Sequence, residues 1–303
     1  MNRFVRWVVR TWVAVVVIAV LGLGFVYWRS SSMMARRISI NEAALTLPTD
    51  AASIAQGKRL TVLRGCTDCH GTDLGGGKPL VDSFFVGRVV GPNLTRGRGG
   101  LGARLTPTLI EHAVRHGVAE GGRMLLFMPS TDFSGLTDAD MADLIAYVRS
   151  VPPVNRSVPT SFAGPLLRTL YVFGKVHLNA AMLIDQHAPH VASISPLPTA
   201  DYGRYLAQAC TGCHGRHLSG GRIPGLPPSF PAAQNITQNP ADGIGKWTHS
   251  DFINAIHTGK RPDGTAINPF MPWQAFSTTM TDVELDAIWA YLKTVPARPS
   301  GQR

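Results

Sequence analysis

The sequence predicts an all-α protein in which two tandem helical domains follow an N-terminal transmembrane helix. Three observations support this: an apolar run of 18 residues near the N-terminus, an internal repeat offset by 142 to 144 positions, and amphipathic helix patterns in both copies, with only weak strand patterns. We expect a membrane anchor at 1–35, a linker at 36–50, domain 1 at 51–153, an interdomain linker at 154–197, domain 2 at 198–298 and a tail at 299–303.

The apolar run extends from Thr11 to Trp28. As a helix it would be about 27 Å long, close to the thickness of a bilayer core. Aromatic side chains near its ends, including Trp12 and Tyr27, favour the headgroup level. A cleaved signal peptide is the alternative, but the run is longer than the usual apolar region of a signal and is followed by a poor cleavage site. Three arginines on each side leave the orientation open on charge alone.

Several short motifs carry the internal repeat. They pair as follows: Gly65-Cys66-Thr67-Asp68-Cys69-His70-Gly71 with Ala209-Cys210-Thr211-Gly212-Cys213-His214-Gly215, Asn93-Leu94-Thr95 with Asn235-Ile236-Thr237, Met128-Pro129 with Met271-Pro272, and Ala146-Tyr147 with Ala290-Tyr291. Because the offset stays nearly constant over the whole unit, the repeat indicates a duplicated domain.

Each copy is predicted to end in a helix that begins after a threonine cap. Thr281 with Glu284 forms a capping box, and Thr137 occupies the same place in the first copy. The residues that follow are spaced to form one apolar face: Leu285, Ile288, Trp289 and Leu292 in one copy, and Met141, Leu144, Ile145 and Val148 in the other. Earlier helices are expected after Thr248 and after Thr106.

Another helix precedes each cysteine pair and contains Gly57 or Gly203, against which we expect Tyr147 or Tyr291 of the last helix to pack. Between the domains, Leu166, Leu167, Leu170, Tyr171 and Phe173 predict a short helix that bridges them. Residues 30–50 have the composition of a plain linker from the membrane.

The two cysteine motifs, Cys66-x-x-Cys69-His70 and Cys210-x-x-Cys213-His214, have the spacing of c-type haem attachment. Both thiolates add to the porphyrin vinyl groups, and the adjacent histidine ligates the iron. All four cysteines of the chain belong to these motifs. Neither motif is followed by the paired histidines of a zinc finger or set in the βαβ pattern of a thioredoxin-like pair. The sequence therefore predicts two covalently bound haem c groups.

The second axial ligand of each iron is expected to be a methionine. Met128 lies 58 residues after His70, and Met271 lies 57 residues after His214. A thioether opposite histidine raises the reduction potential of a haem. Met124 is a competing candidate in the first copy. We expect the remaining histidines to be surface or packing residues: His112, His116, His177, His187, His190, His217, His249 and His257.

The chain carries a formal net charge of +10. Ionised propionates of two haems would lower this to roughly +6. No Lys/Arg stripe or aromatic-studded basic sheet is present, so the charge does not indicate a nucleic-acid-binding protein. A basic surface suits an acidic redox protein or anionic lipid as partner.

At these motifs the sequence resembles class I cytochromes c. More closely, it is similar to the mono/dihaem cytochrome c family and to the cytochrome c subunits of membrane-bound alcohol and gluconate dehydrogenases, which carry three haem motifs where this chain has two. The specific marks are the first cysteine motif, Arg261-Pro262-Asp263-Gly264 and Pro269-Phe270-Met271-Pro272-Trp273. Gly91-Pro92-Asn93-Leu94 resembles the segment whose proline carbonyl binds the proximal histidine, and the second copy lacks this proline.

The resemblance implies two class I cytochrome c-like domains in the periplasm, tethered by a single-pass helix to the inner membrane. With both irons ligated by histidine and methionine, the protein is expected to be an electron carrier and not an enzyme. It would pass single electrons from a protein donor to a protein acceptor in a respiratory or dehydrogenase-linked chain. The alternatives are the electron-transfer subunit of a dehydrogenase or oxidase complex and a dihaem peroxidase.

Overall fold

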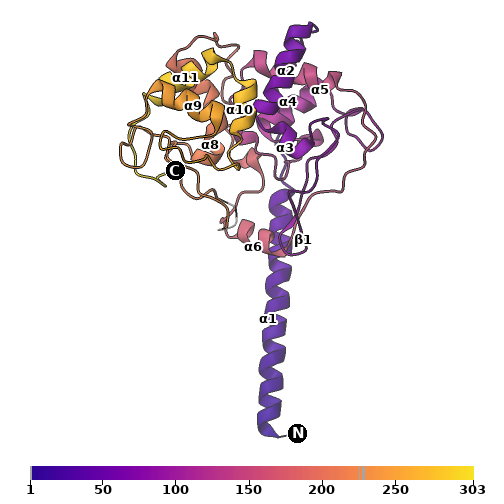
Figure 1. Ribbon diagram of the computed structural model, residues 1–303. Coiled ribbons are helices and arrows are strands. Elements are labelled where there is room, and N and C mark those ends of the chain that lie inside the picture. Colours follow the sequence, from indigo (N-terminus) through magenta and orange to yellow (C-terminus); the bar gives the residue numbers. More distant parts are fainter. Residues whose placement is uncertain (1, 225, 227–228) are drawn as a thin grey trace.

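A computed structural model of the protein describes residues 2–224, 226 and 229–303. One long helix, α1 (Arg3–Met34), projects from a globular part that holds the rest of the chain (Figure 1). Its most apolar stretch has a mean hydropathy of 2.3 and none of it is buried against protein. The predicted helix over the apolar run is confirmed, and it continues beyond that run to Met34.

The first half of the globular part is built from short helices. They are α2 (Ala51–Leu63), α3 (Cys66–His70), α4 (Pro107–Glu111), a π-helical turn η1 (His112–His116), the 3₁₀ turns η2 (Glu120–Gly122) and η3 (Ser130–Asp132), and α5 (Asp138–Ser150). The second half contains α7 (Ala200–Leu206), α8 (Gln208–His214), α9 (His249–Thr258), α10 (Trp273–Thr279) and α11 (Asp282–Leu292). Between them lie α6 (Pro165–Val172) and the 3₁₀ turn η4 (Ala180–Met182).

The predicted helix caps are confirmed. Thr281 and Thr248 form capping boxes in which the threonine hydroxyl accepts from a backbone N–H three residues on and the acidic side chain accepts from the threonine N–H. Thr137 and Thr106 also accept at their helix starts. These caps satisfy backbone donors that a short helix would otherwise leave unpaired.

In each half the first and last helices cross at a glycine. A Cβ on Gly57 would lie 2.0 Å from the Asp143 carbonyl oxygen, and one on Gly203 would lie 1.8 Å from that of Ala287. The Cβ atoms of Tyr147 and Tyr291 come next to the same glycines, as expected. The helix pairs α2–α5 and α7–α11 therefore approach more closely than any residue other than glycine would allow at positions 57 and 203.

One apolar core runs through both halves. From the first it includes Leu60, Leu144 and Ile145, and from the second Leu206, Leu285 and Ile288, all buried. Because the core is continuous, the two halves are held in a fixed relation to each other.

Three short strands form a sheet that the sequence patterns do not predict, so the chain is mostly helical but not strictly all-α. β1 (Val81–Ser83) pairs with β2 (Gly87–Val89), which pairs with β3 (Phe162–Ala163), both antiparallel. With two or three residues each, these strands are too short for a period-2 pattern to be recognised.

The predicted short helix in the interdomain linker exists as α6, but it does not bridge the domains. It packs against the C-terminal end of α1 (Figure 1). Arg168 donates from Nη1 to the hydroxyl oxygens of Ser30 and Ser31, at 2.8 and 3.1 Å, and its Cζ lies 4.8 Å from the ring centroid of Tyr27. Leu167 and Tyr171 of α6 thus share an apolar cluster with Met33 and Met34 of α1.

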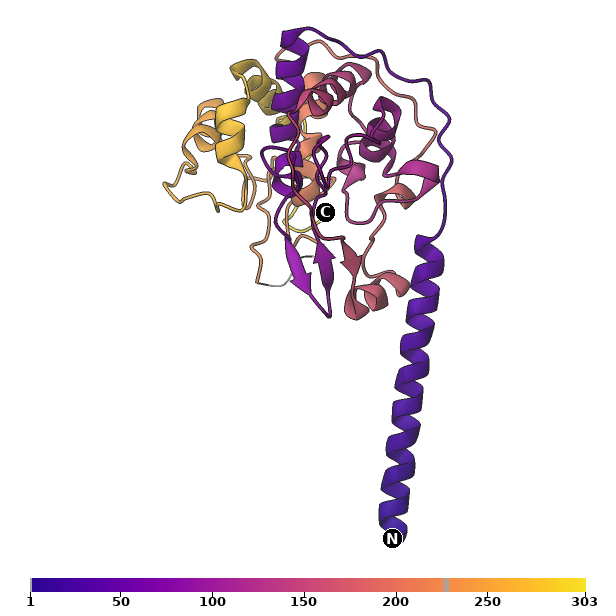
Figure 2. The same ribbon diagram turned by 90° about the vertical axis from the view of Figure 1, so that its right-hand side faces the viewer.

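The segment after α1 is not a free linker. It runs in extended form along the first half of the globular part (Figure 2). The Ile38 N–H donates to the Gly122 carbonyl oxygen at 2.9 Å, and Ile38 and Ile40 pack on a small core formed by Val118, Met124 and Ala181. The expectation of a plain linker is therefore wrong for this stretch.

Candidate haem-binding sites

The two Cys-x-x-Cys-His motifs form matching helical turns, α3 and α8. Each histidine donates from Nδ1 to a backbone carbonyl oxygen: His70 to Pro92 at 2.9 Å and His214 to Gln234 at 2.7 Å. This hydrogen bond fixes the tautomer and leaves Nε2 with a free lone pair. Burial lowers the pKa of both histidines, which favours the neutral, ligating form.

Gln234 occupies the position in the second copy that Pro92 has in the first, and its carbonyl oxygen still accepts the hydrogen bond from the histidine. Only the carbonyl oxygen at this position is used, so the side chain is free to differ between the copies. The Pro92 carbonyl oxygen thus accepts the hydrogen bond from the proximal histidine, as the resemblance implies. The Gln234 carbonyl oxygen does the same in the second copy, which the sequence did not predict.

Cys66, Cys69 and Cys210 are half-buried, and Cys213 is exposed. Burial raises the pKa of the Cys66 thiol to about 12 and that of Cys210 to about 11. Burial also raises the pKa of Cys69 and Cys213. All four are free cysteines. Each pair of thiols is therefore available to form thioether bonds to a porphyrin edge.

Met128 and Met271 lie in the same local structure. In each case the methionine carbonyl accepts from the N–H two residues on, Ser130 at 2.9 Å and Trp273 at 2.8 Å. The intervening prolines have φ and ψ of −82° and 57°, and of −78° and 47°, which is an inverse γ-turn. Both methionines are half-buried and pack against the main core, whereas Met124 is buried in the separate small core with Val118.

A repeated Asn-x-Thr motif joins the loop that follows each cysteine motif to the segment after the last helix of the same half. Asn93 Oδ1 accepts from the N–H and hydroxyl of Thr95, and Asn235 Oδ1 accepts in the same way from Thr237. The asparagine amides donate to carbonyl oxygens of the segment after the last helix, Val154 in one half and Arg298 in the other. The sequence shows these residues as repeated, but it does not reveal this clamping role.

Arg64, two residues before Cys66, lies between the two cysteine motifs. Its side chain is buried, its Cζ lies 5.3 Å from the ring centroid of Tyr205, and its positive charge partly offsets the effect of burial on the pKa of both Cys66 and Cys210. Its Nη1 has no hydrogen-bond partner among the described residues. One guanidinium is therefore in electrostatic reach of both candidate sites.

Contacts between the halves are reciprocal around this arginine. The turn η3, directly after Met128, packs against α8, and a Cβ on Gly212 would lie 2.8 Å from Asp132 Oδ2. The helix α10, directly after Met271, packs against α2, where Arg59 donates to the Thr279 carbonyl oxygen at 3.2 Å. Each methionine loop thus leads into the other half of the protein.

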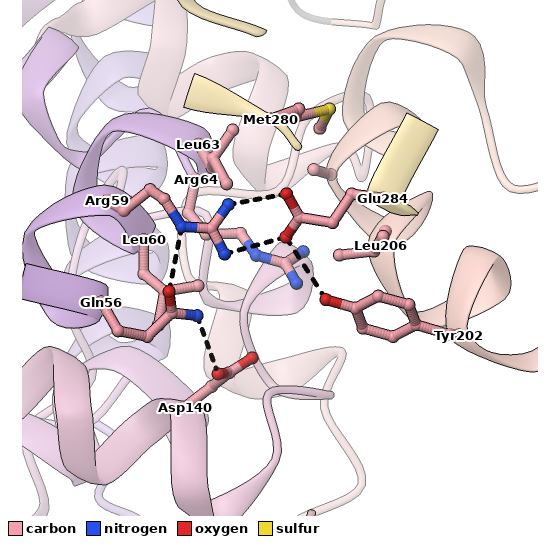
Figure 3. A pocket seen from close by; sticks show the side chains of 11 residues that line it. Gln56, Arg59, Leu60, Leu63, Arg64, Asp140, Tyr202, Leu206, Met280 and Glu284 are labelled. Atoms are coloured by element: carbon pink, nitrogen blue, oxygen red, sulfur yellow. Dashed lines mark hydrogen bonds and ion pairs between the residues drawn. The ribbon is translucent and has the colours of Figure 1, made fainter. Parts of the chain in front are cut away.

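A polar cluster joins the halves beside these contacts (Figure 3). Arg59 donates to both carboxylate oxygens of Glu284, at 2.7 and 2.8 Å, and to Gln56 Oε1 at 2.9 Å. Tyr205 donates to Asp140. Burial raises the pKa of Glu284, but hydrogen bonds from Arg59 and Thr281 outweigh it and hold that pKa below its ordinary value. The interface is therefore ordered by charge as well as by apolar contact.

These features fit a covalently bound haem in each half. Each His Nε2 is free to ligate because the other ring nitrogen is committed, and all four cysteine thiols are free. The buried Arg64 Nη1 and Ser219 Oγ, both without a hydrogen-bond partner among the described residues, are polar atoms that a propionate could satisfy.

The sequence model of the family described as cytochrome c matches this chain twice, at residues 54–152 and 200–296. The chain belongs to the cytochrome c family. Each matched region contains one Cys-x-x-Cys-His motif and one Met-Pro turn. Members of this family hold haem c covalently, so the predicted family and the kind of cofactor are confirmed.

Curated relatives of this cytochrome are subunits of larger enzymes or dihaem proteins. It is 30% identical over 287 residues to the "Fructose dehydrogenase cytochrome subunit" of Gluconobacter japonicus, with 85% of this chain and 56% of the relative covered. It is 27% identical over 298 residues to "Alcohol dehydrogenase (quinone), cytochrome c subunit" of Gluconacetobacter polyoxogenes, with 86% and 59% covered. This cytochrome therefore spans somewhat more than half the length of these two relatives.

A third relative, "Diheme cytochrome c-type" of Cereibacter sphaeroides, is 27% identical over 271 residues, with 80% of this chain and 86% of the relative covered. The relatives named for fructose, alcohol and gluconate dehydrogenases are cytochrome subunits and not the catalytic enzymes, which agrees with the prediction that this cytochrome is an electron carrier.

Three parts of the candidate sites are not predicted by the sequence patterns: Arg64, Gln234 and the hydrogen-bonding role of the Asn-x-Thr motifs. Arg64 has no counterpart in the second copy, where Gln208 stands at the same offset, so a search for shared residues passes over it. That asymmetry between two otherwise matching motifs is the signal that could have identified it.

Proposed function

We propose that this cytochrome holds two haem c groups and carries single electrons from a protein donor to a protein acceptor. Cys66 and Cys69 would attach one haem and Cys210 and Cys213 the other, with His70 and Met128, and His214 and Met271, as the axial iron ligands. A haem with two axial protein ligands supplies one-electron chemistry without an open site for substrate. The domain boundaries at 51–153 and 198–298 are part of the same proposal.

The observation that carries this proposal is the position of Arg64 between α3 and α8. Arg64 and Ala209, which precede the two cysteine motifs, line the same small pocket, and Arg64 lies over the ring of Tyr205. The two attachment turns therefore lie at one interface and not at opposite ends of the protein. The reciprocal packing of η3 on α8 and of α10 on α2 supports the same arrangement. Two redox sites at one interface would allow an electron to enter at one and leave from the other.

The choice of Met128 over Met124 rests on the local backbone. Met128 shares the inverse γ-turn and the contact with the main core that Met271 has. Met124 belongs to the separate small core, on which Ile38 and Ile40 pack, so its thioether contacts that core and not the main one.

We also propose that α1 crosses the inner membrane once and leaves the haem domains in the periplasm. The contacts of Arg168 with Tyr27 and Ser30 place α6 beside the C-terminal end of the apolar run. Six exposed apolar side chains lie on or directly beside α6 and the three-stranded sheet; we name them the apolar rim: Leu80, Phe84, Phe85, Phe162, Leu166 and Phe173. At that level the rim would meet the headgroup region of the bilayer, where aromatic rings are favoured.

Haem content per chain tests the main proposal. The pyridine haemochrome absorbance gives the haem concentration, and its ratio to the protein concentration should be two haems per chain in the wild type. A denaturing gel stained for haem should show that both are covalently bound. The variants Cys66→Ala/Cys69→Ala and Cys210→Ala/Cys213→Ala should each retain one haem. One haem in the wild type, or two in either variant, would contradict the assignment.

A second candidate function is that of an electron-transfer subunit in a dehydrogenase complex. The names of the fructose and alcohol dehydrogenase cytochrome subunits favour it. Purification from membranes in mild detergent should then yield a stoichiometric partner with dehydrogenase activity. A dihaem peroxidase would instead require a labile axial ligand, and binding of CO to the reduced native protein would identify one.

A further inference from the structure

A cluster of two histidines and one carboxylate lies outside the candidate haem sites. Glu42 comes from the segment between α1 and α2, His116 from the turn η1, and His190 from the segment between the two halves. One ligand atom from each lies within 4.8 Å of the other two. His116 is 1% exposed, so its surroundings in the protein decide its chemistry.

Both ring nitrogens of His116 face oxygen atoms. Nδ1 lies 2.8 Å from Gln186 Oε1, and Nε2 lies 2.9 Å from Glu42 Oε2. The orientation of the Gln186 amide is fixed because its Nε2 donates to the carbonyl oxygen of Ala181 at 2.8 Å. Gln186 Oε1 must therefore accept from Nδ1–H.

This arrangement leaves a neutral His116 with a lone pair on Nε2 directed at a carboxylate. Two electron-rich atoms 2.9 Å apart need a shared positive charge, either a proton between them or a metal ion bound to both. Donation from the other ring nitrogen to an oxygen is the contact by which metal-ligating histidines are usually oriented. His190 adds a second imidazole, with Nε2 at 3.6 Å from Glu42 Oε1.

We propose that Glu42, His116 and His190 form a site for one divalent transition-metal ion of the zinc class. Two imidazole nitrogens and one carboxylate oxygen are a donor set that such ions accept, with a further position left for water. His116 Nε2, His190 Nε2 and the Glu42 carboxylate are the ligand atoms.

The charges around the cluster agree with a divalent cation. Glu42, Glu111 and Asp138 line the adjoining cleft, and Arg115 is the basic group that faces them. Arg115 is engaged by Asp138 at 2.9 Å and by Glu111 at 3.9 Å, which leaves Glu42 to the histidines. His190 Nδ1 lies 3.9 Å from Asp138 Oδ1, so a second carboxylate stands beside the cluster.

An ion at this site would join three distant parts of the chain. Glu42 follows the anchor helix, His116 belongs to the first half and His190 precedes the second. The ion would thereby hold the segment after α1 against the globular part and restrict rotation of the candidate haem domains about the anchor. This role is independent of the proposed electron transfer, so neither proposal depends on the other.

Zinc binding to the full-length protein in detergent tests the proposal. After treatment with EDTA and removal of the chelator, Zn²⁺ is titrated by calorimetry, and zinc is counted separately from iron by elemental analysis. We expect one Zn²⁺ per chain in the wild type. The variants Glu42→Gln and His190→Gln should weaken the binding at least tenfold while their haem spectra stay unchanged. Glu42 and His190 are chosen because they are less buried than His116, so the variants should still fold.

His249→Gln is the matched control, because His249 pairs with Asp286 at 2.7 Å on the exposed surface of the second half. It should bind Zn²⁺ as the wild type does. Hydrogen exchange of residues 38–47 should also slow when Zn²⁺ is added to the wild type, and not in Glu42→Gln. No stoichiometric binding, or equal binding by wild type, Glu42→Gln and His190→Gln, would overturn the proposal and leave a proton as the charge between His116 and Glu42.

Discussion

Arg59 of α2 donates to both carboxylate oxygens of Glu284 on α11, at 2.7 and 2.8 Å, and so ties the first half of this cytochrome to the second. The Glu284 side chain is 4% exposed. Arg59→Met would leave a buried carboxylate without its cation, which costs about 3 kcal/mol. We expect a lower midpoint of urea unfolding at pH 7, followed by circular dichroism.

The same pair predicts a pH dependence. Because the pKa of Glu284 is lowered in the folded protein, its contribution to stability is complete above the unfolded pKa near 4.5 and is lost as the pH falls through the lower, folded value. The difference between wild type and Arg59→Met should therefore shrink below about pH 4.5. Arg204→Met, which affects an exposed pair with Asp201, is the control and should change little at either pH. An equal loss at pH 4 and pH 7 would contradict the account.

Arg64 predicts a shared shift of two reduction potentials. A positive charge near both proposed haem sites disfavours the oxidised state of their irons, so Arg64→Met should lower both potentials. For a separation of about 10 Å and a dielectric constant of about 20, the effect is about 1.7 kcal/mol, or roughly 70 mV for one electron. Arg64→Lys keeps the charge and should retain most of the wild-type value. A shift of only one potential in a spectroscopic titration would show that Arg64 serves a single site.

The helix crossings predict that alanine is not tolerated at two glycines. Gly57→Ala and Gly203→Ala would each place a Cβ within 2.0 Å of a carbonyl oxygen, so the helices must move apart. We expect a loss of about 3 kcal/mol from overpacking in each case, measured by urea unfolding. Gly24→Ala, where nothing lies within 4 Å, is the control and should leave the midpoint unchanged. Wild-type stability of Gly203→Ala would show that α7 and α11 do not cross as described.

The apolar rim predicts contact with lipid. A nitroxide on Phe84→Cys in nanodisc-embedded protein should collide more often with oxygen, which dissolves in lipid, than with a water-soluble nickel chelate. A nitroxide on Val283→Cys, an exposed position on α11, should show the opposite preference. Equal accessibility to the nickel chelate at both positions would exclude immersion of the rim.

Much of the site could be predicted from the sequence because its motifs are local. Cys66, Cys69 and His70 are almost adjacent, and the duplication shows each motif twice. The helix caps at Thr137 and Thr281 were equally readable, since a cap depends on residues three apart. The π-helical turn at 112–116 was not predicted, since its residues continue an ordinary helix pattern.

The contacts that unite the halves were not predictable in this way. Arg59 and Glu284 are 225 residues apart, and neither belongs to the repeated motifs. The bridging role expected for α6 was wrong because an apolar face does not specify its partner, which is α1. The extended path of residues 38–47 depends on backbone hydrogen bonds such as Ile38 to Gly122, which leave no pattern in side-chain composition.

The most direct test of the central claim is a spectroscopic redox titration of the wild type, Met128→Ala, Met271→Ala and Met124→Ala. We predict two low-spin components with an iron–sulfur absorption band in the wild type. Met128→Ala and Met271→Ala should each abolish the band and lower the potential of one component only, while Met124→Ala keeps both. Retention of both bands in Met128→Ala, or loss of one in Met124→Ala, would contradict the ligand assignment.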